Sequence, residues 1–362
     1  MTSTNQYFYL VYGFFFLLSV IFSLLINRLF LNFVKTLGIR NSDVPVVRWS
    51  TQAKPAVGGF SFYIIFLLSI VGFSVFFDTN KVFLNKEFIG ILLASMLGFL
   101  LGLTDDAYNT KPLLKLAAQI TCGVILTVTG TVINLTPFAG LNYFITVFWT
   151  VGIMNSLNLL DNMDGISGSV SVSILLSALA IMILHNQYDS VYFITMTGVV
   201  AALLGFLYYN WHPSKIYMGD TGSQFLGVFL AAMGIKFLWN AEPSSGDFIS
   251  FKNLLLPIIV FIMPLIDTTS VFINRIMNGQ SPFVGGKDHT THALANLGFS
   301  ERQVAVVFWS ITIVSVILVL IIERYLTVWN HFYTSLFAVY ILVMFSAFYY
   351  ITRLKTAKRE SA

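Results

Sequence analysis

Two adjacent acidic residues are the clearest candidates for chemistry in this sequence. Asp105 and Asp106 end an apolar segment, where neighbouring carboxylates repel each other and oppose the helix dipole. A bound Mg²⁺ would relieve both penalties, because this hard cation prefers oxygen ligands. Two alternatives stay open: one carboxylate is a ligand and the other a general base, or the pair only caps a surface helix.

A second polar segment carries amides and carboxylates at a spacing of three residues. Its members are Asn155, Asn158, Asp161 and Asp164. On a helix this spacing places the four side chains roughly along one face, so we expect them to point the same way. The alternative for Asp164 is to cap the helix that begins near Ile166.

A third polar segment begins at Asn210 and contains Asp220. This acid lies between Gly219 and Gly222 at the start of an apolar span, where glycines permit close backbone approach and a helix N-terminus attracts anions. Helix capping would explain one aspartate here. Beside the other acidic segments, however, it predicts a site for phosphate and metal.

Two histidines, His289 and His292, lie three residues apart in a loop that begins with Gly285 and Gly286. Carboxylates outnumber histidines in the polar segments, which argues against zinc. We therefore expect the histidines to contact phosphate or to transfer a proton near neutral pH. The alternative is a pair of solvated loop histidines.

Asp267 differs from these acids because it lies inside an apolar span, shortly after Pro264. An ionisable residue at membrane depth suggests a functional role. An equally good interpretation is a structural acid that pairs with a donor on another helix.

The elements that must hold these side chains are membrane-spanning helices. The chain has 362 residues, of which 57% are hydrophobic and 10% charged, and its mean hydropathy is +0.81. A soluble domain has about 25% charged residues. This composition excludes a soluble globular protein, a disordered chain and a nucleic-acid binder. The single cysteine, Cys122, excludes a disulfide framework and a cysteine-based metal site.

The length of the apolar segments predicts one all-α polytopic domain over residues 1–362. About 20 helical residues cross a bilayer core about 30 Å thick. Eleven segments meet this length, near residues 8–26, 57–77, 88–104, 112–130, 138–154, 166–184, 191–209, 222–239, 254–276, 304–322 and 332–351.

The distribution of basic residues predicts the orientation of these spans. Three quarters of the 20 lysines and arginines fall on the side that also carries the polar segments. The positive-inside rule places this side in the cytoplasm and the amino terminus outside. We therefore expect a site that faces the cytoplasm.

Together, these motifs resemble the polyprenyl-phosphate N-acetylhexosamine-1-phosphate transferases, glycosyltransferase family 4. The resemblance runs from Pro45 to about Gln303. The stretch from Pro264 to Phe283 favours the undecaprenyl-phosphate N-acetylglucosamine-1-phosphate transferase branch. The motifs that carry the resemblance are the Asp-Asp pair, Asn-x-x-Asn-x-x-Asp-x-x-Asp-Gly, Met-Gly-Asp-x-Gly-Ser, Asp43-x-Pro45-x-x-Arg48 and Pro55-x-x-Gly58-Gly59.

The resemblance implies an enzyme of the bacterial cytoplasmic (inner) membrane. It would transfer N-acetylhexosamine-1-phosphate, by default N-acetylglucosamine-1-phosphate, from a UDP-sugar to undecaprenyl phosphate, release UMP and initiate an envelope polysaccharide. Mg²⁺ is the implied cofactor, with Mn²⁺ as the alternative. The implied partners are the UDP-sugar, the lipid carrier and membrane lipid, and a homodimer stays open. Alternative functions are a phospho-N-acetylmuramoyl-pentapeptide transferase and a membrane transporter.

The resemblance also implies roles for individual residues. Asp220 is the expected metal ligand, and Asp105 and Asp106 serve in catalysis or further metal binding, while His289 and His292 act at the phosphates. Asn210, Asp161 and Asp164 would hold uridine, and Tyr217 would stack on uracil. The substrate-binding residues are Lys54, Lys111, Lys115, Asn155, Asn158, Asp161, Asp164, Asn210, Tyr217 and Lys287.

Three positions depart from the family pattern. Asn162 stands where the family commonly has glycine, and Thr291 where it usually has a further histidine. Leu113 stands where a lysine is often found, so either Lys111 or Lys115 must take over the phosphate contact.

Overall fold

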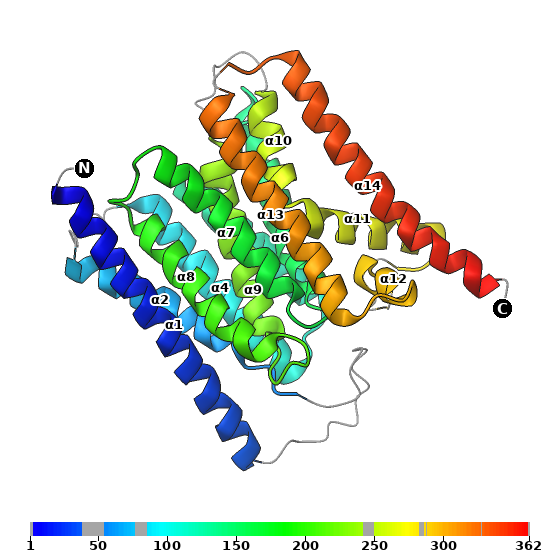
Figure 1. The fold of residues 1–362 in the computed structure, drawn as a ribbon, viewed down its shortest axis with the longest axis horizontal. Helices are drawn as coiled ribbons and strands as arrows, with labels where there is room; N and C mark the ends of the chain where they lie inside the picture. Colours follow the sequence, from blue (N-terminus) through cyan, green and yellow to red (C-terminus); the bar gives the residue numbers. More distant parts are fainter. Residues whose placement is uncertain are drawn as a thin grey trace.

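The computed structural model describes residues 3–37, 54–76, 85–241, 250–281, 286, 288–326 and 328–360. These residues form a bundle of long helices (Figure 1). The helices are α1 (Ser3–Leu37), α2 (Gly58–Phe76), α4 (Lys86–Tyr108), α5 (Pro112–Thr129), α6 (Ala139–Leu160), α7 (Ile166–Leu184), α8 (Val191–Asn210), α9 (Gly219–Gly234), α10 (Phe251–Val260), α11 (Ile262–Met277), α12 (Thr290–Asn296), α13 (Glu301–Tyr325) and α14 (His331–Glu360).

Ten of the described helices are long and apolar enough to cross a membrane, or eleven if α10 and α11 are counted as one bent span. The sequence prediction of an all-α protein with about eleven spans is therefore confirmed. The side of the membrane on which each terminus lies stays a prediction.

Helix α9 is the centre of the bundle, and a π-helical turn, Ile235–Trp239, extends it. Figure 1 shows it surrounded by other helices, with α1 and α14 on opposite flanks. Nearly all of its membrane-length segment is buried, whereas little of the α14 segment is buried. Exposed apolar side chains on the outer helices, such as Phe14 and Leu342, suit contact with lipid tails.

Glycines let α4 press closely against α9. A Cβ added to Gly98 would lie 2.9 Å from the Val228 Cγ1 atom, and one added to Gly102 would lie 2.5 Å from the Thr221 Cα atom. Small residues four positions apart permit such close approach between membrane helices. As a result, the end of α4 that carries the Asp-Asp pair meets the start of α9.

The predicted span 254–276 is not one straight helix, because the chain bends by 80° between α10 and α11. Pro264 has no N–H to donate to the carbonyl of residue 260, and its ring would crowd that carbonyl. The proline is well tolerated in the first turn of a new helix, and α11 begins at Ile262. The bend directs α11 away from the axis of α10.

Candidate active site

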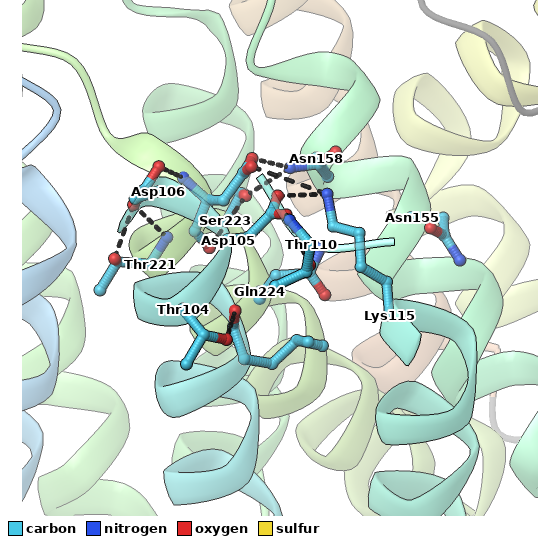
Figure 2. A network of polar contacts seen from close by, with 12 residues as sticks. Thr104, Asp105, Asp106, Thr110, Lys115, Asn155, Asn158, Thr221, Ser223 and Gln224 are labelled. Carbon is cyan, nitrogen blue, oxygen red and sulfur yellow. Dashed lines mark hydrogen bonds and ion pairs between the residues drawn. The ribbon is translucent and has the colours of Figure 1, made fainter. Parts of the chain in front are cut away.

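Four helices bring charged and amide side chains together at one end of the bundle (Figure 2). We call Asp105, Asp106, Lys115, Asn158 and Asp220 the acidic cluster. The Lys115 ammonium pairs with the Asp105 carboxylate and lies 3.7 Å from Asp220 Oδ2. Asn158 Nδ2 donates to Asp220 Oδ1 at 2.5 Å. Residues from α4, α5, α6 and α9 therefore meet around one lysine.

Asp106 fastens α4 to the start of α9. Its carboxylate accepts hydrogen bonds from the backbone N–H groups of Asp220 and Thr221, both at 2.9 Å, and from Thr221 Oγ1 at 2.6 Å. A carboxylate is favourable there, because these N–H groups have no partner within the helix and the helix dipole is positive at its start. The cap of α9 thus comes from α4, whereas Asp220 directs its side chain to Asn158.

The acidic cluster has the composition of a divalent cation site. It contains three carboxylates and one ammonium group, so negative charge is in excess. Carboxylates from two helices, Asp105 and Asp220, already converge on the positive charge of Lys115. Hard oxygen donors are those that Mg²⁺ prefers, so the donor chemistry of these residues suits this ion. Among the described residues, however, the three ligand atoms that already lie within 4.8 Å of one another belong to Asp164, His212 and Glu301.

Of the two candidate lysines, Lys111 and Lys115, Lys115 is the one that reaches the acidic cluster. It lies one helical turn after Lys111, which is exposed at the start of α5. Only Lys115 of the two has its ammonium between the Asp105 and Asp220 carboxylates. Of the two lysines, Lys115 is therefore the one that belongs to the acidic cluster.

A second group, which we call the loop cluster, surrounds Asp164. This carboxylate accepts from Ser214 N at 2.9 Å and Ser214 Oγ at 2.7 Å. Lys54 Nζ lies 3.9 Å from Asp164 Oδ2. His212 Nδ1 lies 3.2 Å from Asp164 Oδ2 and 3.1 Å from Glu301 Oε2. Here two carboxylates share two basic side chains, Lys54 and His212, whereas the acidic cluster has three carboxylates and one lysine.

Asn210 and Tyr217 flank the loop cluster. Asn210 Oδ1 accepts from Gly165 N at 3.0 Å and its Nδ2 donates to Ile216 O at 2.9 Å. This amide therefore holds the turn after α6 against the strand-like segment before α9. The half-buried Tyr217 ring has its centroid 5.2 Å from Lys54 Nζ.

The first loop reaches the same place through its backbone. Gly58 N and Gly59 N donate to Tyr217 O and Met218 O, both at 3.0 Å, and Tyr217 N donates to Pro55 O at 2.9 Å. The motif Pro55-x-x-Gly58-Gly59 thus pairs with the segment before α9. The predicted residues Asp43, Pro45, Arg48 and Lys287 lie outside the described part of the chain.

The four side chains at a spacing of three do not share one face, so this prediction is wrong. Helix α6 ends at Leu160, and only Asn155 and Asn158 lie on it. Asn155 pairs with the amide of Gln119 at 2.9 and 3.1 Å, and Figure 2 shows it apart from the Asp105 side chain. Asp161 ends the helix, and Asp164 turns to the loop cluster.

The helix ends there because the next residues favour a turn. Asn162 Nδ2 donates to Leu159 O at 2.7 Å, and such side-chain bonds compete with helix continuation. Gly165 then adopts φ +76° and is the N-cap of α7. The expectation that Asp164 caps this helix is therefore also wrong.

The loop that carries the histidines is folded onto the protein. His289 and His292 are 5% and 3% exposed, so the alternative of solvated histidines is wrong. Arg275 Nε and Nη2 hold Asp288 at 2.7 and 2.8 Å. Burial raises the pKa of the Asp288 carboxyl, but the hydrogen bonds and charge of Arg275 outweigh burial and hold it below its ordinary value.

Two of the three departures from the family pattern are partners of each other. Thr291 Oγ1 donates to Asn162 Oδ1 at 2.7 Å. This bond joins the histidine loop to the turn after α6, although the two residues are far apart in the sequence. It brings the fourth polar segment to the end of the bundle that carries the other three.

His212 and Glu301 also belong to the loop cluster, although neither is part of a motif that predicts a role. The available signal for His212 was its place two residues after Asn210, inside the third polar segment. Glu301 carries no such signal, because only the fold brings the start of α13 next to Asp164.

Comparison of the sequence with known proteins identifies the family. The sequence model of glycosyl transferase family 4 matches residues 88–238. The chain is 30% identical over 300 residues to a probable undecaprenyl-phosphate N-acetylglucosaminyl 1-phosphate transferase of Bacillus subtilis, covering 80% of this chain and 78% of the relative. It is 28% identical over 285 residues to a decaprenyl-phosphate N-acetylglucosaminephosphotransferase of Mycobacterium tuberculosis, covering 70% and 69%.

A third relative comes from another branch. It is a phospho-N-acetylmuramoyl-pentapeptide-transferase of Staphylococcus carnosus, 30% identical over 286 residues that cover 72% of this chain and 82% of the relative. The similarity therefore includes proteins named for different sugars.

Proposed function

Because this chain belongs to glycosyl transferase family 4, the polyprenyl-phosphate N-acetylhexosamine-1-phosphate transferases, we propose that it transfers N-acetylglucosamine-1-phosphate from UDP-N-acetylglucosamine to undecaprenyl phosphate. Family membership makes the chain a phosphosugar transferase. The donor sugar, the lipid acceptor, the dependence on Mg²⁺ and the cytoplasmic position of the site are our proposal.

The acidic cluster is the observation that carries this proposal. Transfer between a UDP-sugar and a lipid phosphate brings two anions together, so positive charge must offset their repulsion. Asp105 and Asp220 would hold a divalent cation, and such an ion supplies stabilisation of the charge on the phosphoryl oxygens. Lys115, which lies between these carboxylates, adds a second positive charge at the same place.

The chemistry exchanges one phosphorus–oxygen bond for another. An oxygen of the lipid phosphate attacks the β-phosphorus of the UDP-sugar, the bond from this phosphorus to the bridging oxygen breaks, and UMP leaves. Asn158 orients the Asp220 carboxylate, because its amide donates to one carboxylate oxygen. Asp106 keeps Asp220 in place through its bonds to the backbone of α9.

The loop cluster would receive the nucleotide end of the donor. Tyr217 offers a half-buried aromatic face for uracil, beside the Lys54 ammonium. Asn210 and Asp164 fix the backbone that leads up to this ring, at Ile216 and Ser214. His289 and His292, which the Thr291–Asn162 bond ties to the turn after α6, would contact the phosphates.

The decisive test uses the protein purified in detergent with Mg²⁺, undecaprenyl phosphate and a panel of UDP-sugars. We expect lipid-linked sugar and UMP from UDP-N-acetylglucosamine, and incorporation of labelled UMP into the donor by the reverse reaction. Removal of the metal with EDTA should abolish both reactions, and added Mg²⁺ should restore them. Failure of every UDP-sugar would overturn the proposal.

A phospho-N-acetylmuramoyl-pentapeptide transferase is the second candidate, favoured by the similarity that covers 82% of the Staphylococcus carnosus relative. The same panel separates the two. Turnover of UDP-N-acetylmuramoyl-pentapeptide without turnover of UDP-N-acetylglucosamine would replace our proposal with this candidate.

A further inference from the structure

We propose that Asp267 is a positioning residue that fixes the proton of His289 on Nδ1 and so presents Nε2 to the substrate phosphates. The kinetic part of this inference rests on the proposed function. The position of the proton does not, because it follows from contacts within the protein alone.

The geometry around Asp267 is specific. The residue lies on α11 and is 0% exposed. Its Oδ2 atom lies 2.8 Å from His289 Nδ1. Its Oδ1 atom accepts from Thr290 N at 2.8 Å and from Thr290 Oγ1 at 2.6 Å. Both carboxylate oxygens are thus used by two consecutive residues of the histidine loop.

These contacts determine which ring nitrogen carries the proton. An ionised carboxylate can only accept hydrogen bonds, so His289 Nδ1 must donate to Asp267. The remaining nitrogen, Nε2, is then an acceptor in the neutral ring and a donor in the charged ring. A carboxylate that holds a histidine in this way sets its tautomer and its orientation.

Contacts on both sides of His289 hold the histidine loop in place, so the orientation of the ring is fixed. Arg275, two helical turns further along α11, grips Asp288 with two hydrogen bonds. Thr291 is tied to Asn162 on the other side. His289 therefore lies in a stretch of four residues that α11 and the turn after α6 fix together, and the bend before α11 brings Asp267 to this stretch.

Asp267→Asn separates positioning from simple anchoring. The asparagine Oδ1 can still accept both bonds from Thr290, so the loop keeps its anchor. The Nδ2 group can only donate, so it would need an unprotonated Nδ1 on His289. The substitution should therefore move the ring proton to Nε2 while the loop stays in place.

The first measurement is ¹⁵N NMR of the protein labelled at its five histidines, with His289→Ala used to assign the signal. In the wild type at pH 8 we expect a protonated Nδ1 for His289. In Asp267→Asn we expect a protonated Nε2. A wild-type His289 with the proton on Nε2 would overturn the inference, even if Asp267→Asn failed to fold.

The second measurement is the transfer reaction. We expect Asp267→Asn to lower kcat about 10²–10³-fold, in the range of general acid–base effects, with the KM for the UDP-sugar changed less than about threefold. In an Asp–His–Ser hydrolase, the same exchange costs about 10⁴-fold through the wrong tautomer. The double variant Asp267→Asn/His289→Ala should match His289→Ala within about twofold, because the two residues act as a unit.

Thr290→Val is the matched control, because it removes one hydroxyl bond to Asp267 and leaves the His289 contact intact. It should lower kcat less than about threefold. A further tenfold loss in the double variant, or full activity of Asp267→Asn, would overturn the positioning role. A wild type without any transfer activity would instead refute the proposed function, and the NMR result would still decide where the proton lies.

Discussion

Helices α4 and α9 carry charged residues at both of their ends, and these residues pair differently at the two ends. α4 and α9 run antiparallel, so the start of α4 meets the π-helical end of α9. There, Lys236 Nζ lies 2.5 Å from Glu87 Oε2 and 4.5 Å from the centroid of the Tyr192 ring. At the other end, Asp105 and Asp106 meet Asp220. One end joins opposite charges, and the other joins like charges.

This difference suggests that the Glu87–Lys236 pair is a structural contact, whereas the acidic cluster is the candidate site. The Glu87–Lys236 pair is neutral as a unit and needs nothing further. The acidic cluster keeps an excess of negative charge that Lys115 alone does not balance, and like charges held close together are costly. A fold selected only for stability would favour the neutral arrangement, and the excess charge is what supports our proposal of a cation at the acidic cluster.

Asp220→Asn should produce the largest change. We expect kcat to fall about 10³-fold, since mutations that remove an electrostatic contribution of this kind cost about 10²–10³-fold or more. Removal of a like charge should leave the thermal unfolding midpoint unchanged or raise it. Transfer assays and unfolding in detergent measure the two effects. Near-normal turnover would remove the acidic cluster from the site.

Gly102→Ala tests the close contact between α4 and α9 that brings the acidic cluster together. A Cβ at this position meets the backbone of Asp220 and Thr221, so the helices must separate. Displacement of about 1 Å at a site can cost about 10²-fold in rate, and overpacking costs about 1–3 kcal/mol of stability. We expect a 10- to 100-fold loss of turnover with a lower unfolding midpoint.

The matched control for this substitution is Gly140→Ala. Gly140 also lies in a helix, and an added Cβ there meets no atom within 4 Å. It should retain turnover and stability. Equal losses in both variants would mean that the α4–α9 contact has no special role.

Lys115→Gln tests whether the Lys115 ammonium and a bound cation offset the same carboxylates. Without this ammonium the carboxylates repel each other more strongly, so the unfolding midpoint in EDTA should fall below that of the wild type. Saturation with a ligand at about 100 times its Kd stabilises by about 2.7 kcal/mol, and we expect the shift on adding Mg²⁺ to be larger in Lys115→Gln. Equal shifts in the two proteins would show that Lys115 and the ion do not share the site.

The Glu87–Lys236 end should give the smallest effect. Both side chains are partly exposed, at 41% and 27%, and such pairs contribute up to about 1 kcal/mol. A double-mutant cycle of Glu87→Gln and Lys236→Met should return a coupling in this range, with turnover within about twofold of the wild type. A large loss of transfer activity would mean that this end also takes part in function.

The spans and the convergence of the polar segments could be predicted from the sequence because both depend on local composition. Apolar length predicts each helix, and helix ends that alternate between faces bring Asp105, Asp164 and Asp220 to one end. The resemblance to the family added the roles that composition cannot supply.

The features that could not be predicted correctly from the sequence depend on tertiary contacts. A face shared by Asn155 and Asp164 requires a helix that continues past Leu160, and competing side-chain bonds end it. The Asp106 cap on α9 joins two helices that are separated by more than 100 residues. The bend at Phe261 was signalled by Pro264, although a proline alone does not tell a kink from a break.

The Thr291–Asn162 bond has a consequence for the construction of chimaeras. Each of these two residues is the hydrogen-bond partner of the other, although they are far apart in the sequence. A histidine loop taken from a relative that lacks Thr291, or placed opposite a turn that lacks Asn162, would therefore lose this hydrogen bond. Loop and turn form a single transplantable unit, and grafts should carry positions 162 and 291 together.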